Sequence, residues 1–379
     1  MRHTIILLLL VLCGCSTTPT NSGSAGDWLF FRGDAAMSGY TKIRLPENPA
    51  IQWTYKSDLR TSSSPLVYHG TVYWSDRRGR IQGVDNQGKL CFNYTFQTAI
   101  DATPLIHDSV LYIGRIDGNM SALSLATQET LWNFETWGQL VASANIVDFE
   151  GRKALVFGSY DNFLYSLDIN NGEEINRIES GYYLNGAVAL WKDCVIFGGC
   201  DGWIRIVDCR NGIQTDSLEA DAYIPASPAV RGDYCYIADY TGNVYEIYLK
   251  NGKFERRRKI VEAVSENSAF VSVPAVSDNT LFIVSDDQYL YAINRTDGAV
   301  KWKYLLKGNT GESSPVVCND KVIVCTKTGV ITIIDAKAGT LLWEYDTGEQ
   351  ITASPAITNG YFYILTTRGT LFCFGNTKK

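Results

Sequence analysis

The chain has few of the residues that build metal and haem sites. It contains three histidines, and its ten cysteines include no CxxC, CxxCH or adjacent Cys-Cys pair. Zinc, haem c and dithiol redox sites depend on such spacings, so the sequence gives them no support. His69 and His107 stand beside predicted hairpin turns, without a partner at ligand or triad spacing. We interpret both as surface loop residues.

The chain also lacks an excess of positive charge. Its 34 Lys and Arg residues face 40 Asp and Glu residues, which gives a net charge of −6. Nucleic acid is therefore not an expected partner. The basic run Arg256–Lys259 is predicted to lie on an outermost strand, where charges keep a sheet edge from pairing with other sheets. A binding patch is the less favoured alternative for this run.

After its first residues the chain has no apolar run long enough to span a bilayer. Residues 1–15 are predicted to be a lipoprotein signal peptide, because Arg2 and His3 precede the apolar run Ile5–Leu12. The sequence Leu12-Cys13-Gly14-Cys15 resembles a bacterial lipobox, and the resemblance implies lipidation of Cys15. An ordinary secretory signal is the alternative. Residues 16–26 are small and polar and are predicted to form a flexible tether.

A pattern that returns eight times occupies the chain from Pro65 onward. Each copy contains short alternating apolar runs, as in SSPLVYHGTVYWS from Ser63 and ASPAITNGYFYILT from Ala353. Repeats of about 40 residues built from such runs are typical of a β-propeller. We predict an all-β, eight-bladed propeller over residues 27–376. The anchor positions, 39 to 46 residues apart, are Pro65, Pro104, Ala144, Ala187, Pro228, Pro274, Pro315 and Pro355.

Each copy is predicted to form four antiparallel strands. In the seventh copy, apolar runs at 315–318, 322–326, 330–335 and 341–345 are separated by turn residues. The last copy ends at Phe374 after its third run, and a matching fourth run occurs at the start of the chain, at 51–55. We therefore predict that this N-terminal strand closes the ring and covers the edges that an open ring would expose.

The turn before the third strand needs a positive φ, which Gly adopts without strain. Asn162 and Gln288 occupy this position in two copies, and Gln tolerates positive φ less well, so the Gln288 turn is expected to differ. The glycines of the other six copies are Gly79, Gly118, Gly202, Gly242, Gly329 and Gly369.

Eight cysteines follow the predicted lipidation site. A bridge from Cys200 to Cys194 or to Cys209 is open in an oxidising compartment. Those in alternating apolar runs are predicted to be buried thiols that act as small hydrophobes: Cys194, Cys235, Cys325 and Cys373.

The stretch Asp335–Trp343, DAKAGTLLW, resembles the tryptophan-docking motif AxDxxTGxxxW of pyrroloquinoline-quinone (PQQ) repeat propellers. The stretch Trp28–Asp34, WLFFRGD, resembles the lead-in segment of those proteins. The motif's Gly ends a turn, and its Trp packs against the neighbouring blade. The predicted blade-docking residues are Trp53, Phe92, Trp132, Trp302 and Trp343.

Three consecutive blades lack this aromatic residue. The aligned positions are Asn176, Asp216 and Arg256, which leaves one arc of the ring chemically different. One hypothesis is that this arc contacts a partner. The favoured alternative is that other residues replace the Trp packing.

Acidic residues recur near the turn before the third strand and are expected on one face of the ring. Such carboxylates can bind Ca²⁺ or a basic segment. The favoured interpretation is turn chemistry, since Asp side chains cap the backbone two residues on. These residues are Asp76, Asp117, Asp161, Asp201, Asp239 and Asp286.

Two groups of proteins share the PQQ-repeat resemblance. For PQQ-dependent dehydrogenases it implies quinone and Ca²⁺ on the ring axis, often with an adjacent Cys pair, which this chain lacks. For BamB-type lipoproteins of the β-barrel assembly machinery it implies an acylated, cofactor-free propeller that binds protein. Our expectation is the second, a non-enzymatic scaffold at the periplasmic side of the outer membrane, monomeric within a complex. Its expected partner is a protein of the envelope, either the barrel-assembly machinery or unfolded outer-membrane proteins. Alternatives are a small PQQ- and Ca²⁺-dependent dehydrogenase, or a carbohydrate-binding surface propeller, which exposed aromatics on one face would favour.

Overall fold

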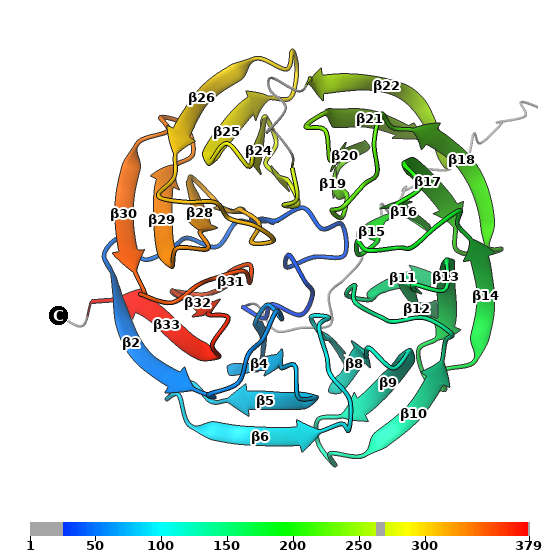
Figure 1. Cartoon of the computed structure of the whole chain (residues 1–379), viewed down its shortest axis with the longest axis horizontal. Helices are drawn as coiled ribbons and strands as arrows, with labels where there is room; N and C mark the ends of the chain where they lie inside the picture. Colours follow the sequence, from blue (N-terminus) through cyan, green and yellow to red (C-terminus); the bar gives the residue numbers. More distant parts are fainter. Residues whose placement is uncertain (1–25, 263–269, 378–379) are drawn as a thin grey trace, which may run out of the picture.

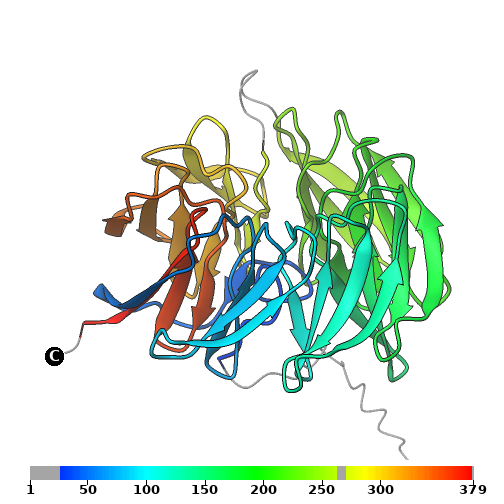
Figure 2. The same ribbon diagram turned by 60° about the horizontal axis from the view of Figure 1, so that its bottom comes forward.

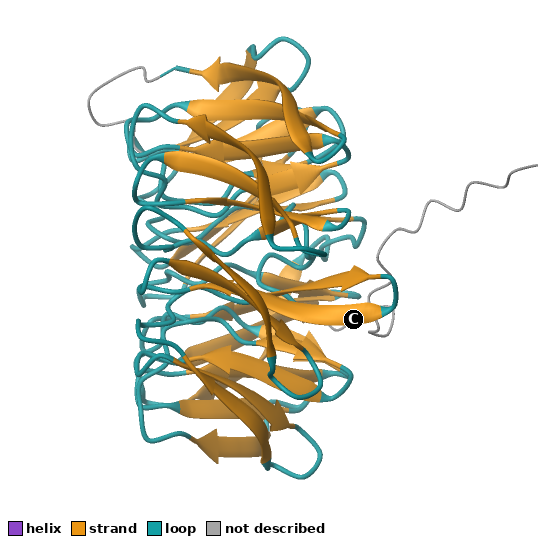
Figure 3. Cartoon of the chain, turned by 90° about the vertical axis from the view of Figure 1, so that its right-hand side faces the viewer, coloured by secondary structure: helices purple, strands orange, loops and turns teal. Residues whose placement is uncertain are grey.

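A computed structural model describes residues 26–262 and 270–377. The predicted signal peptide over 1–15, the lipidation site Cys15 and all but the last residue of the tether over 16–26 lie outside the described residues. The described chain is built from strands, turns and loops (Figure 3). In this part of the chain no helix is long and apolar enough to cross a membrane.

The strands form eight sheets arranged around a central axis, as predicted (Figure 1). Blades one and two consist of β3 (Leu66–Tyr68), β4 (Thr71–Ser75), β5 (Arg80–Val84), β6 (Leu90–Thr95), β7 (Leu105–His107), β8 (Val110–Gly114), β9 (Asn119–Ser124) and β10 (Thr130–Glu135). Blades three and four consist of β11 (Asn145–Phe149), β12 (Arg152–Gly158), β13 (Phe163–Asp168), β14 (Glu174–Glu179), β15 (Ala189–Trp191), β16 (Cys194–Gly198), β17 (Trp203–Asp208) and β18 (Ile213–Glu219).

The second half of the ring repeats this organisation. Blades five and six consist of β19 (Ala229–Arg231), β20 (Tyr234–Ala238), β21 (Val244–Lys250), β22 (Lys253–Val261), β23 (Ala275–Val276), β24 (Thr280–Val284), β25 (Tyr289–Asn294) and β26 (Val300–Leu305). Blade seven consists of β27 (Val316–Cys318), β28 (Lys321–Cys325), β29 (Val330–Asp335) and β30 (Leu341–Asp346). Blade eight consists of β31 (Ala356–Thr358), β32 (Tyr361–Leu365), β33 (Thr370–Asn376) and β2 (Pro49–Lys56).

The ring closes as the sequence predicts. Strand β2 pairs antiparallel with β33, and Trp53 lies opposite Cys373. The N-terminal strand thus completes the last blade, so no open blade edge is left at the seam. A further short strand, β1 (Tyr40–Thr41), adds in parallel to the inner edge of blade seven, with Tyr40 opposite Val317.

The turn before the third strand has the same conformation in every blade. Its φ angle lies between 70° and 96° at all eight positions, including 74° at Asn162 and 70° at Gln288. The expectation that the Gln288 turn would differ was wrong. The Gln288 amide donates to the Ser285 carbonyl oxygen at 3.0 Å, as Gly79 does to Asp76, so this tight turn forces the left-handed conformation on either residue type.

The inner three strands of each blade are buried on both faces, and the fourth strand alternates between buried and exposed residues. The four cysteines predicted to be buried thiols are buried. The eight described cysteines are all free, so neither pairing open to Cys200 is present. Burial raises the pKa of Cys194 to about 11, which keeps this thiol protonated and unreactive.

His107 is not a surface residue, contrary to the prediction. It is 8% exposed at the end of β7, and its Nε2 lies 2.9 Å from the Lys153 Nζ and 3.1 Å from the Asp108 carboxylate. Burial lowers the pKa of His107. The sequence interpretation failed because Lys153 comes from the next blade, 46 residues along the chain.

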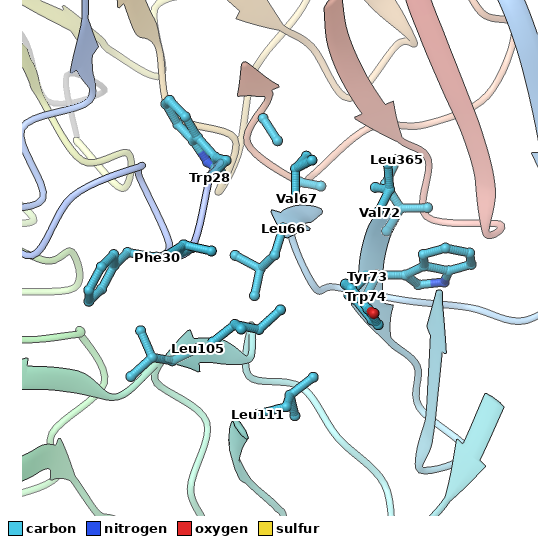
Figure 4. Close-up of a cluster of buried hydrophobic side chains, with 14 of the residues drawn as sticks. Trp28, Phe30, Leu66, Val67, Val72, Tyr73, Trp74, Leu105, Leu111 and Leu365 are labelled. Atoms are coloured by element: carbon cyan, nitrogen blue, oxygen red, sulfur yellow. The ribbon is translucent and has the colours of Figure 1, made fainter. Parts of the chain in front are cut away.

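Residues 27–41, here called the axial segment, run across the centre of the ring (Figure 1). Trp28 pairs with Val67 of blade one, and the Leu29 carbonyl oxygen accepts from the Ile106 amide of blade two at 3.1 Å. Carbonyl oxygens of residues 35, 36, 38 and 39 accept from the innermost strands of blades four to seven. Trp28 and Phe30 lie beside Leu66 and Leu105 near the axis (Figure 4).

The loops at the two ends of the blades form two faces (Figure 2). The upper face consists of the connections between blades and the turns between second and third strands. The lower face consists of the other turns within each blade. The described chain begins on the lower face, where Asp27 Oδ1 accepts from the His69 amide at 2.9 Å, in the turn between β3 and β4.

Candidate protein-docking face

The sequence-predicted docking aromatics lie between neighbouring blades. Trp53 donates its indole N–H to the Asn86 carbonyl oxygen at 2.9 Å, and Trp132 donates to that of Ile169 at 3.2 Å. Trp302 donates to the Ala336 carbonyl oxygen at 3.2 Å. Each acceptor belongs to the turn before the fourth strand, in the next blade around the ring.

The other two docking residues contact neighbouring aromatic rings. Phe92 is 5% exposed and meets Tyr73 of its own blade edge to face, with ring centroids 5.6 Å apart. Trp343 meets Phe374 of blade eight at 5.5 Å. How much each aromatic contributes to blade docking stays a prediction.

The arc without aromatics is occupied by polar residues in the same places. Asn176 lies over Gly212 as Trp132 lies over Gly172, and its Nδ2 donates to the Cys209 carbonyl oxygen at 3.4 Å. Asp216 Oδ2 accepts from the Phe254 amide of blade five at 3.0 Å. These contacts favour replacement of the Trp packing over a free partner surface.

In blade five the equivalent residue is Arg258, and the alignment of Arg256 was wrong by two residues. Arg258 lies opposite Glu246, four residues after the turn glycine, where the other blades place the aromatic. Its Nη2 donates to the Arg295 carbonyl oxygen at 2.8 Å, the counterpart of the Trp53 bond to Asn86.

In blade five Lys250 pairs with Lys253 across a two-residue turn. The paired part of the β21–β22 hairpin thus extends further toward the turn than in blade four, where Asp208 pairs with Ile213. The position four residues after the glycine of this turn is therefore Arg256, two residues before the place of the aromatic.

Six aromatic side chains, here called the aromatic face, lie on the upper loops from blade two to blade five. Trp137 is 95% exposed, and Tyr182 and Tyr240 are about half exposed. Tyr160 stacks on Tyr183 with centroids 5.0 Å apart, and Tyr223 stacks on Tyr240 at 4.5 Å. The members are Trp137, Tyr160, Tyr182, Tyr183, Tyr223 and Tyr240.

Sequence reasoning missed the aromatic face, although a signal was present. Trp137, the pair Tyr182–Tyr183 and Tyr223 occupy the connections between blades, where loops such as 97–99 and 347–350 carry no aromatic residue. Aromatic residues confined to one set of loops indicate interaction rather than core. The stacking partners come from different loops, so the sequence does not show that they meet.

The recurring aspartates hold these loops in place. Asp161 accepts from the Phe163 amide of its own turn at 3.2 Å and from the Trp137 amide at 3.0 Å. Asp201 accepts from the Trp203 amide at 3.1 Å and from the Gly181 amide at 3.0 Å. The turn-chemistry interpretation therefore fits. Among the described residues no group of three His, Cys, Asp or Glu side chains is placed to hold a metal ion.

A hollow of about 660 Å³ lies beside Trp137 on the aromatic face. Tyr160 and Tyr183 form one wall, and Asp117 and Glu135 supply carboxylates. None of the described residues that line it is a lysine or arginine. Asp117 is paired with Arg115 at 3.4 Å, so the hollow combines flat aromatic surface with the negative charge of Glu135.

A second hollow, of about 460 Å³, lies on the axis, with Phe31 of the axial segment in its lining. Its charged residues are Arg77, Asp101 and Glu312, and Asp101 is already paired with Arg77 at 2.7 Å. Calcium takes six to eight oxygen ligands. These residues do not fit a calcium-bound quinone.

Two overlapping matches to the family model described as outer membrane protein assembly factor BamB cover residues 46–258 and 200–379. Outer membrane protein assembly factor BamB of Legionella pneumophila is 27% identical over 38% of this chain and 36% of that protein. The Shewanella oneidensis protein of the same description is 20% identical over 81% of this chain and 83% of its own. The alignments span 36% to 54% of the length of the first three relatives.

Solved structures share the fold. BamB from Moraxella catarrhalis superimposes with a TM-score of 0.73 at 19% identity, over 86% of this chain and 97% of that one. Quinohemoprotein alcohol dehydrogenase from Comamonas testosteroni gives a TM-score of 0.72 at 14% identity, over 93% of this chain and 81% of that one. Likenesses at these identities show the architecture alone.

Proposed function

The chain belongs to the family of the outer membrane protein assembly factor BamB, and from this membership we propose that it is a non-enzymatic protein-binding scaffold in outer-membrane β-barrel assembly. The proposal includes a lipid anchor at Cys15, a location at the periplasmic side of the outer membrane, and action as a monomer within a complex. Its partner is a protein of the cell envelope.

The aromatic face is the observation that carries the proposal. Exposed Trp and Tyr residues are enriched at the energetic centres of protein interfaces, because they bury a large area with few rotatable bonds. Trp137 is 95% exposed and has Asp117 and Glu135 beside it. This chemistry suits a partner segment that brings apolar surface and basic side chains.

Hydrogen bonds fix the loops that carry the aromatic face. Asp161 and Asp201 each bond both to their own turn and to the neighbouring interblade loop, so they fix the loop of Trp137 and the loop of Tyr182 and Tyr183. The pKa of Tyr223 is raised to about 12, first by burial and then by its hydrogen bond to Tyr240, so this phenol stays neutral. A rigid, neutral aromatic surface loses little entropy on binding.

Cross-linking in intact cells tests the proposal. The tagged full-length chain is compared with a Trp137→Ala, Tyr183→Ala double variant, and co-purifying proteins are identified by mass spectrometry. We expect a barrel-assembly component with the parent chain and a reduction of about tenfold or more with the double variant. Tyr361→Ala is the control, since Tyr361 is 44% exposed at the start of β32, beside a lower-face turn. Recovery of no envelope protein, or equal recovery from all three chains, overturns the proposal.

Carbohydrate binding is a second candidate, favoured by the same stacked tyrosines. Sugar rings lie flat on exposed aromatic side chains, and carboxylates beside them accept hydrogen bonds from hydroxyls. Titration of the purified chain with soluble cell-wall glycan fragments, followed by tryptophan fluorescence, tests it. A fluorescence change with the parent chain that is lost in Trp137→Ala supports this candidate, and an unchanged spectrum removes it.

A further inference from the structure

A pocket of about 480 Å³ lies between blades five and six, well away from the aromatic face. Asp278 and Arg295, which belong to turns of the lower face, line it together with residues of β20, β21 and β22. Three of its lining residues are arginines: Arg256, Arg258 and Arg295.

A buried network fixes two of these arginines. The Glu246 side chain is almost fully buried, and its carboxylate accepts from the Arg258 Nε at 2.8 Å and from the Tyr236 hydroxyl at 2.7 Å. Arg295 donates from Nε to the Tyr236 oxygen at 2.7 Å and from Nη1 to the Asp278 carbonyl oxygen at 2.7 Å. The guanidinium groups therefore have set positions before any ligand arrives.

Several N–H donors of the pocket arginines take no part in this network. Arg258 makes its bonds through Nε and Nη2, and Arg295 uses Nη2 only for a 3.4 Å bond to the Arg231 carbonyl oxygen. The Arg256 side chain is exposed and forms no hydrogen bond or ion pair with another described residue; its guanidinium lies 5.7 Å from the Tyr248 ring centre. Since a guanidinium carries five N–H donors, several remain for a ligand.

The pocket also has an excess of positive charge. Glu246 offsets one of the three arginines, and the Asp278 carboxylate is paired with a fourth arginine, Arg231, at 2.7 Å. Four cations thus face two carboxylates. The strand pattern adds to this: Arg256 and Arg258 alternate onto the pocket side of β22, while Arg257 lies opposite Ile247 and on the other side of the sheet.

We propose that this pocket binds a phosphate-type oxyanion. Guanidinium groups match the oxygens of phosphate in paired, charge-assisted hydrogen bonds, and fixed arginines make such bonds at low entropic cost. The pocket opens on the face where the described chain begins, at Asp27. If the chain is anchored there by lipid, phospholipid headgroups are a source of this chemistry as well as free phosphate.

Calorimetric titration of the full chain distinguishes the two sources. The probes are inorganic phosphate and dihexanoyl phosphatidylglycerol below its micelle concentration, at constant ionic strength. We expect binding in the range of about 1 mM or tighter. Binding of phosphate alone assigns the pocket to the free anion, and binding of both, in competition, assigns it to the headgroup.

The matched variants are Arg256→Gln and Arg257→Gln, neighbours on β22 that remove the same charge. Arg256→Gln should weaken binding about tenfold, and Arg257→Gln should leave it within about twofold. Arg256 is exposed and takes no part in the buried network, so its loss leaves the fold intact. Absence of binding by both probes, or equal weakening in the two variants, overturns the proposal.

Discussion

Trp53 of blade eight donates its indole N–H to the backbone carbonyl oxygen of Asn86 in blade one, 2.9 Å away. The indole lies over Gly88, whose φ of 78° and lack of a Cβ make room for the ring. Trp53 belongs to the strand that closes the ring, so this contact holds the last blade against the first. The same contact recurs around the ring, and here it fixes strand β2, which is joined to β33 of its own blade by hydrogen bonds without a covalent connection.

Replacement of Trp53 by Ala should therefore destabilise the whole ring. We expect the free energy of unfolding to fall by about 3 kcal/mol, because a packed aromatic and its hydrogen bond are lost together. Urea denaturation followed by circular dichroism measures the change. Trp137→Ala is the matched control and should stay within about 0.5 kcal/mol of the parent, since Trp137 is 95% exposed. Equal losses from the two substitutions would contradict the role of Trp53.

Asn176→Trp should stabilise the chain. The Asn176 Oδ1 is buried without a hydrogen-bond partner, and the side chain lies over Gly212 as Trp132 lies over Gly172. An indole at this position removes the unsatisfied acceptor and buries more apolar surface, so we expect a gain of about 1 kcal/mol in the free energy of unfolding. Trp132→Asn, the reverse change one blade earlier, should lose more than that. A loss from Asn176→Trp would show that blade three has no space for the ring.

The blade number could be predicted from the sequence because the repeat anchors and the positive-φ turns are local signals. The closing strand could be predicted because the last copy lacks one run that the start of the chain supplies. The equivalence of Arg258 could not be predicted, since the turn between β21 and β22 has only two residues, 251 and 252, where blade four has four, 209–212. The number of residues after a turn locates a strand position only where the turn has the same length in every blade.

The candidate site was harder to predict than the fold. Tyr160 and Tyr183 stack because a turn within blade three lies beside the loop that leaves this blade, and their contact leaves no periodic signal in the chain. The Arg256–Lys259 run was interpreted as protection of an outer strand, and β22 is the outermost strand of its blade. The pocket that Arg256 and Arg258 line between blades five and six also depends on Glu246 and Arg295, which come from other strands and turns. A site whose residues come from several blades can be recognised only in the structure.

The stability of the chain should depend on pH through Asp201. Burial would raise the pKa of Asp201, but hydrogen bonds from Arg205 and from backbone amides outweigh it, so the pKa lies below its usual value. A folded pKa below the unfolded one adds stability above about pH 4, and this contribution is lost as the pH falls through the folded pKa. The difference in unfolding free energy between the parent and Asp201→Asn should therefore be larger at pH 7 than at pH 3.

Urea denaturation at the two pH values measures this difference. Asp58→Asn serves as the control, because it removes the same charge from a carboxylate whose side chain is 78% exposed, and it should stay within about 0.5 kcal/mol of the parent at both pH values. A parent-to-Asp201→Asn difference that does not change with pH would assign the effect of the substitution to packing.

Among the residues of the axial segment, Arg32 should contribute most to the stability of the centre of the ring. It is 1% exposed and donates to the carbonyl oxygens of Pro315 at 2.7 Å and Pro274 at 3.1 Å, in blades seven and six. Burial lowers the pKa of Arg32 to about 9, which still leaves it charged at neutral pH. Gly39 is needed beside it, since a Cβ there would lie 2.0 Å from the Arg32 Nη2.

Arg32→Met keeps most of the side-chain volume but removes every donor, so buried carbonyl oxygens in two blades lose their partner. We expect a loss of about 3 kcal/mol in the free energy of unfolding. Trypsin should also cleave faster after Lys42, because the axial segment then loses its side-chain hydrogen bonds to blades six and seven. Arg44→Met, an exposed position a few residues on, is the control and should change neither quantity. If the two variants have the same free energy of unfolding and the same cleavage rate, Arg32 does not stabilise the centre of the ring. The axial segment then does not connect the blades through this side chain.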